Sequence, residues 1–206
     1  MNIGRAMGGT ISHPVRTFKA VSSGPRPLAV GLKAVLAAGA LFALAAAGLA
    51  VSGALVTAPP ILKIVPENYY FWEMVFALPV FAAAWLTAGI FGGLASPRGG
   101  PGSFRGFLSS LGLALAVPSL LAWIPQAVLA VLLLLGRKQE EVMEWTAHPG
   151  LAQSIALGCQ VLAVVWMFAL TSAAARSSRK LGRARSAAVG SVAALIFLAV
   201  SLVFIR

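Results

Sequence analysis

KAVLAAGALFALAAAGLAVSGALV, residues 33–56, has no charged side chain after its first lysine. A helix needs about 20 consecutive apolar residues to cross the hydrocarbon core of a bilayer. Lys33 can extend its amine from the edge of that core toward water. The apolar part of a signal peptide covers only about 7–15 residues, so we expect this stretch to be a retained membrane span.

Four further stretches of the chain have the same character. They cover about Tyr70–Leu94, Phe107–Leu135, Leu151–Ala174 and Ala187–Ile205. Of the 206 residues, 59% are hydrophobic and 10% are charged, whereas soluble domains are about half apolar and a quarter charged. The sequence therefore predicts an all-α integral membrane bundle of five transmembrane helices. An N-terminal segment, 1–32, precedes this five-span domain, 33–206.

The third stretch is longer than one perpendicular crossing requires, and it contains Pro118 and Pro125. Each proline removes a backbone donor and clashes with the preceding turn. We expect these two residues to act as hinges of a kinked or tilted helix. Two half-helices are the alternative.

The basic residues are distributed unevenly between the two sides of the membrane. The N-terminal segment and the second and fourth loops hold five, two and five Lys or Arg, whereas the first loop, the third loop and the tail hold one, two and one. Because cytoplasmic loops are enriched in Lys and Arg, we predict a cytoplasmic N-terminus and a C-terminus outside. Charges placed in this way argue against nucleic-acid binding, despite the formal net charge of +11.

Two segments outside the spans have amphipathic patterns. In 12–22, Val15, Phe18 and Val21 recur at helical spacing opposite Arg16 and Lys19, which predicts a short helix lying on the inner membrane face. A disordered basic tail is the alternative. The segment 137–146 predicts a second amphipathic helix on the outer side.

The loop from Ser96 to Ser110, SPRGGPGSFRGFLSS, resembles a phosphate-binding loop in its glycines and arginines. It lacks the Gly-Lys-Ser/Thr of a Walker loop, and no strand precedes it as a dinucleotide fingerprint requires. We interpret it as a turn in which Ser103 caps the third helix. The basic residues of this and the fourth loop are candidates for contact with lipid head groups or a partner: Arg98, Arg105, Arg176, Arg179, Lys180, Arg183 and Arg185.

Polar side chains within the spans suggest a path or pocket. Glu73 is the only acid in a predicted span, and intramembrane acids often mark ion or proton paths. Because Tyr70 and Trp72 place it near the outer aromatic belt, we expect a solvated, interfacial Glu73. The other candidates for such a path or pocket are Gln126, Gln160, Trp123 and Trp166, although packing and bonds between helices also explain them.

The spans contain no combination of residues that would suggest catalysis. His13 and His148 lie outside them, and Cys159 is the only cysteine, so we expect no catalytic residues, no metal site and no cofactor.

Small residues recur every four positions at Gly39, Ala43 and Ala47, and at Ser186, Gly190 and Ala194. This spacing lets helices approach closely, either in the bundle or in a homo-oligomer.

Two stretches resemble the Yip domain family, the Ypt-interacting membrane proteins. They are HPVRTF, from His13 to Phe18, and GGPGSFRGFLSSLGLALAVP, from Gly99 to Pro118, with a weaker match from Trp166 onward, WMFAL. The resemblance implies a five-span bundle with a cytoplasmic N-terminus and no enzymatic activity. It also implies Golgi or endoplasmic reticulum membranes for a eukaryotic member, and the inner membrane for a prokaryotic one.

For eukaryotic members, the resemblance implies association with Rab-type GTPases, and their longer N-terminal region carries an Asp-Leu-Tyr-Gly-Pro motif. That motif is absent here, so we do not expect GTPase binding, and the short segment fits a prokaryotic member. The sequence thus predicts a non-enzymatic, membrane-organising or partner-binding protein. Its expected partners are the bilayer, anionic lipids and other membrane proteins. The alternative is a small transporter, channel or lipid-handling protein with a polar path around the third span.

Overall fold

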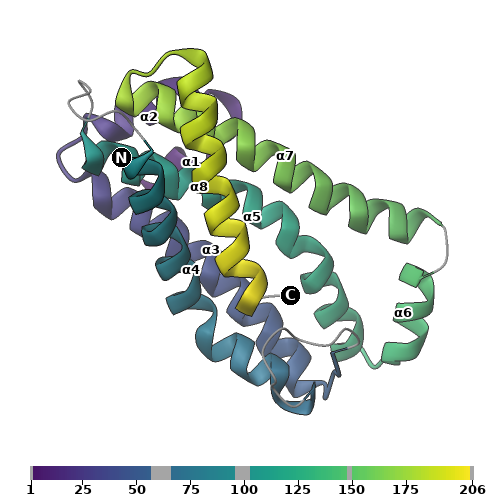
Figure 1. Cartoon of the computed structure of the whole chain (residues 1–206). Coiled ribbons are helices and arrows are strands. Elements are labelled where there is room, and N and C mark those ends of the chain that lie inside the picture. The colour runs from purple at the N-terminus through teal and green to yellow at the C-terminus, as the bar shows by residue number, and fades with distance from the viewer. Residues whose placement is uncertain (1, 57–65, 96–102, 148–149, 205–206) are drawn as a thin grey trace.

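The computed structural model describes residues 2–56, 66–95, 103–147 and 150–204, which form eight α-helices, one short 3₁₀ helix and no strand. The elements are α1 (Ile3–Ser12), α2 (Pro14–Ser22), α3 (Pro27–Val51), η1 (Pro66–Asn68), α4 (Tyr69–Leu94), α5 (Phe104–Leu134), α6 (Gln139–Ala147), α7 (Leu151–Arg179) and α8 (Arg183–Phe204). Figure 1 shows how they are arranged. The predicted all-α class is confirmed.

Five of these helices are long and apolar enough to cross a membrane: α3, α4, α5, α7 and α8. The shortest, α8, has 22 residues and is about 33 Å long at 1.5 Å per residue. A hydrocarbon core is about 30 Å thick, so each helix can span it. The chain is therefore an integral membrane bundle of five helices, as the sequence predicts.

The helix ends differ from the predicted limits by a few residues for local reasons. Helix α3 begins at Pro27, six residues before Lys33, because proline suits the first helical turn, where no backbone donor is needed. Helix α7 continues to Arg179, beyond the predicted Ala174. Its last turn holds Arg176 and Arg179, and cations there interact favourably with the helix dipole.

Helix α5 begins where the sequence predicts a cap. The Ser103 hydroxyl oxygen accepts a hydrogen bond from the Gly106 amide at 2.9 Å, so the predicted capping role is confirmed. The helix then continues without interruption through Pro118 and Pro125. The alternative of two half-helices is therefore wrong, whereas the hinge role of the two prolines stays a prediction.

Helix α5 lies at the centre of the bundle and packs closely on α3. A Cβ added at Gly112 would lie 2.6 Å from the Gly31 carbonyl oxygen, and one added at Gly31 would lie 2.7 Å from Ser109 Cα. The backbones of the two helices are therefore in direct contact. Close packing of small residues is a main source of helix association in membranes.

The predicted small-residue faces also serve contacts within the bundle. A Cβ at Gly39 would lie 3.3 Å from the Ala77 carbonyl oxygen of α4, and a Cβ at Gly190 would collide with the Ser172 backbone of α7. Ser186 and Ala194 are buried beside Gly190 on α8. These faces thus join α3 to α4 and α8 to α7.

The N-terminal segment holds two helices where the sequence predicts one. Helix α1 was not expected. The predicted helix exists as α2, and its Phe18 and Val21 are buried in the main core of the bundle, at 0% and 3% exposed. The prediction that its apolar face lies on the membrane is wrong, because that face packs against the protein; only Val15 of the predicted stripe is exposed.

The second amphipathic helix is present as α6, at the opposite end of the bundle. Its Val142 packs in a small core with Leu49 of α3 and Leu133 of α5. Gln139 joins it to the residues after α3, since its side chain accepts from the Leu55 amide at 2.9 Å and donates to the Leu55 carbonyl. In Figure 1, α7 lies beside α5 near α2 but diverges from it toward α6.

Candidate functional site

Glu73 lies one helical turn into α4, and its side chain is only 2% exposed. The prediction of a solvated Glu73 is therefore wrong, whereas its position near the outer membrane boundary stays a prediction. Phe71 and Trp72 are exposed, whereas Tyr69 is buried and Tyr70 is half-buried, so the aromatic side chains before Glu73 lie on more than one side of α4. A buried carboxyl group requires a polar partner, because loss of its hydration is costly.

The partner of Glu73 is Gln126 of α5. The Gln126 amide nitrogen donates a hydrogen bond to Glu73 Oε1 at 2.8 Å. Glu73 Oε2 and Gln126 Oε1 are also buried, and neither has a hydrogen-bond partner among the residues that the structure describes. The contact joins two helices across 53 positions of sequence, and both helices are long and apolar enough to cross a membrane.

The other predicted path residues do not join this pair. Gln160 is exposed on α7. Trp123 is half-buried and donates from its indole nitrogen to the Leu41 carbonyl of α3 at 2.7 Å. Trp166 is half-buried against the main core. The structure thus brings together two of the five residues predicted for an intramembrane path, and both tryptophans pack between helices.

A basic pocket of about 710 Å³ lies between α2 and the C-terminal end of α7. Its cations are Lys19, Arg176 and Lys180, and three serine side chains and two apolar side chains complete the lining: Ser22, Ser23, Ser177, Val15 and Leu181. We name it the α2–α7 pocket. Two of its cations, Arg176 and Lys180, were predicted to contact head groups; Lys19 was not.

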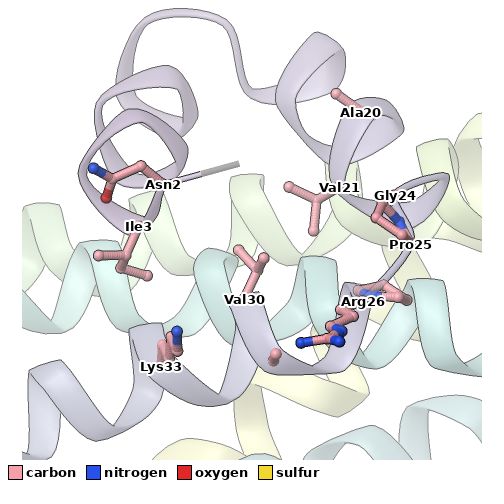
Figure 2. A pocket seen from close by; sticks show the side chains of 11 residues that line it. Asn2, Ile3, Ala20, Val21, Gly24, Pro25, Arg26, Val30 and Lys33 are labelled. Carbon is pink, nitrogen blue, oxygen red and sulfur yellow. The ribbon is translucent and has the colours of Figure 1, made fainter.

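A second basic pocket, of about 670 Å³, lies between α1, α2 and the start of α3. Figure 2 shows Ile3, Val21 and Val30 projecting into it, with Arg26 and Lys33 on the side of α3. We name it the α1–α3 pocket. Sequence reasoning missed it as a site because it depends on α1, which the pattern did not reveal, although both cations were visible beside the first span.

The remaining basic candidates lie at the same end of the bundle. Arg105 is exposed in the first turn of α5, Arg183 and Arg185 are exposed in the first turn of α8, and Arg179 is half-buried at the end of α7. Arg98 lies outside the described residues. All five acids of the chain lie elsewhere, in η1, α4 and α6. One end of the bundle therefore carries a basic surface without acidic neighbours.

Within the described ranges, no three His, Cys, Asp or Glu side chains come together as metal ligands would. What the geometry offers is a buried acid–amide pair inside the bundle and two basic pockets with partly apolar walls at one end. Comparisons of the chain with protein-family models, curated proteins and solved structures found no match.

Proposed function

We propose that this protein is a non-enzymatic membrane protein of the Yip type that binds anionic lipid head groups at its basic end and organises the membrane around it. The observation that carries the proposal is the pair of basic pockets at the ends of helices. Each combines cations with apolar side chains, which is the combination that a phosphate group attached to acyl chains requires.

The α2–α7 pocket has the more favourable electrostatics for an anion. Lys19, Arg176 and Lys180 converge on it from two helices. A cation near an anionic membrane surface contributes about 1 kcal/mol to attraction, and an ionised partner makes each hydrogen bond shorter and stronger than a neutral one. Three such cations would therefore favour an anionic head group over a zwitterionic one.

The α1–α3 pocket adds an apolar wall. Ile3 of α1, Val21 of α2 and Val30 of α3 meet there, next to Arg26 and Lys33. Lys33 is exposed six residues into α3, from where a long basic side chain can reach the head-group layer. Under the positive-inside rule, this end of the bundle would face the cytoplasm, with the N-terminus, and the C-terminus would lie outside.

Retention of lipid by the purified full-length chain tests the proposal. Native mass spectrometry would be run after purification in mild detergent with equal phosphatidylglycerol and phosphatidylcholine. We expect retained phosphatidylglycerol to exceed phosphatidylcholine, and the excess to fall in the variant Lys19→Gln/Arg176→Gln/Lys180→Gln.

The matched control removes charge from the same end without touching either pocket. Arg183→Gln/Arg185→Gln changes two exposed side chains of α8 that line neither the α2–α7 pocket nor the α1–α3 pocket. It should retain the lipid preference. Equal retention of both lipids by the natural chain, or an equal loss of preference in the control, would contradict the pockets as the binding sites.

A second candidate function is a small transporter, channel or lipid-handling protein. One observation favours it: Glu73 and Gln126 meet within the spans, where polar groups commonly serve transport. Reconstitution in liposomes tests it, because Gln126→Ala should lower a flux or lipid-scrambling rate that Gln160→Ala leaves unchanged. Absence of any flux or scrambling would remove this candidate.

A further inference from the structure

In the Glu73–Gln126 pair, two buried acceptor oxygens lack a hydrogen-bond donor among the described residues, and one additional hydrogen would satisfy both. Gln126 Nε2 donates to Glu73 Oε1 at 2.8 Å, which leaves Glu73 Oε2 and Gln126 Oε1 buried and unpartnered among the described residues. Both atoms only accept hydrogen bonds when the carboxyl is ionised. Buried polar atoms without a partner are rare in native structures, so this pair requires an explanation.

We propose that the Glu73–Gln126 pair is a proton-binding site within the membrane-spanning bundle. A proton bound to Glu73 Oε2 forms an O–H bond and neutralises the carboxylate. This O–H group can donate to Gln126 Oε1 while Gln126 Nε2 still donates to Glu73 Oε1. All four polar atoms of the pair then take part in hydrogen bonds, and no charge is left inside the bundle.

The surrounding helices offer no positive charge that could stabilise an ionised Glu73 instead. Ala34–Val51 of α3, Gly106–Leu134 of α5 and Ser186–Phe204 of α8 contain no charged residue, and Glu73 is the only one in α4. The titratable neighbours on α4 itself are Tyr69 and Tyr70. The nearest charged residues along the chain lie beyond the span ends: Lys63, which is outside the described residues, Glu67, Arg137, Lys138, Glu140, Glu141 and Glu144.

A proton suits the pair better than a metal cation does. A cation that leaves water needs a shell of oxygen ligands to replace its hydration. The pair offers two free oxygens, Glu73 Oε2 and Gln126 Oε1, and these are enough for one proton. The inference does not depend on head-group binding, because the pair and the basic pockets share no residue.

Infrared spectroscopy of the full-length protein in lipid vesicles tests the site. At neutral pH we expect the carbonyl band of a protonated carboxylic acid, shifted in heavy water. The chain has five acidic side chains in all, and four of them are exposed. The variant Glu67→Gln/Glu140→Gln/Glu141→Gln/Glu144→Gln therefore leaves Glu73 as the only acidic side chain. It should keep the acid band, whereas Glu73→Gln should lose it. If the quadruple variant shows only ionised carboxylate bands, the proposal is wrong.

Thermal unfolding gives an independent measurement. Raising the pH removes the proposed proton and leaves a buried charge, so the melting temperature of the natural chain should fall. Glu73→Gln should lose this dependence, since its amide can donate to Gln126 Oε1 at every pH. The control Glu141→Gln, an exposed residue of α6, should behave as the natural chain does.

Two results of the thermal measurement would overturn the assignment. One is a pH dependence that Glu73→Gln leaves intact. The other is a melting temperature that sodium raises relative to potassium at equal ionic strength in the natural chain but not in Glu73→Gln, because that result would make the pair a cation site. If Glu73→Gln fails to fold, the infrared measurement on the quadruple variant still decides the question.

Discussion

The two halves of α5 face very different surroundings. Every residue from Gly106 to Ser119 is buried, whereas beyond Ser119 only Ala130 and Leu133 are. The first half is enclosed by α2, α3, α4 and α7. Along the second half α7 diverges from the bundle (Figure 1), and Val128 and Val131 are more than half exposed.

The bundle is therefore fully packed only toward its basic end. The close backbone contacts at Gly31, Gly112 and Gly190 all lie in the packed half. In the other half, an apolar hollow of about 290 Å³ is lined by α5 alone, from Trp123 to Leu132. Lipid chains are as apolar as these side chains, so a membrane can cover the exposed face without cost. The buried Glu73 and its half-buried partner Gln126 belong to this less enclosed half.

Truncation of a large side chain should show the difference in packing between the two halves of α5 most clearly. Leu113 is 0% exposed in the packed half, so Leu113→Ala should lower the free energy of unfolding by about 2–5 kcal/mol through lost contacts and a cavity. Leu134 is 55% exposed in the other half. Leu134→Ala should therefore change the free energy of unfolding by no more than about 0.5 kcal/mol. Denaturant titration in detergent, followed by circular dichroism, measures both. Equal losses would contradict the comparison.

The backbone contact of α5 with α3 is the next target. Gly112→Ala places a Cβ against the Gly31 carbonyl, and forced separation of the helices should cost about 1–3 kcal/mol. The control Gly158→Ala lies on α7 with nothing within 4 Å, and it should gain up to about 1 kcal/mol in helix propensity. The same denaturant titration measures the free energy of unfolding of both variants. A neutral Gly112→Ala would show that the two helices can separate without loss.

Loss of the half-buried Gln126 side chain tests the second half of α5. Gln126→Leu leaves both Glu73 oxygens without a donor and should cost about 1–3 kcal/mol. The control Gln160→Leu replaces an exposed amide on α7 and should be close to neutral. The double variant Glu73→Leu/Gln126→Leu should recover part of the loss, because replacement of both partners by apolar groups can be nearly neutral. Additive losses would show that the two side chains do not interact.

The number, class and approximate limits of the spans followed from the sequence, because a run of about 20 apolar residues is a strong signal. The Ser103 cap was equally clear, since a serine before an apolar helix satisfies a free amide. Helix α1 was missed. Its Gly4, Gly8 and Gly9 lower helix propensity, and its buried Ala6 and Thr10 are small residues that carry little periodic signal.

The candidate site was less predictable than the fold. Amphipathicity showed which face of α2 is apolar, but it could not show whether lipid or protein covers that face. Glu73 was expected to be solvated from its aromatic neighbours, because its partner lies 53 residues away on another helix. Pairing across such a separation depends on helix packing, which local patterns do not report.

The smallest expected difference concerns two indoles that donate to backbone carbonyls, one in each half. Trp85 donates to Leu108 of the packed half at 2.8 Å and is 4% exposed, whereas Trp123 is half-buried and donates to Leu41. Each Trp→Phe change removes one hydrogen bond, so Trp123→Phe should cost about 1 kcal/mol. Trp85→Phe should cost more, because the smaller ring also leaves a void where no lipid can enter. Thermal unfolding in the same detergent measures the order of the two losses, and the reverse order would mean that α5 is more tightly enclosed beyond Ser119 than its exposed side chains indicate.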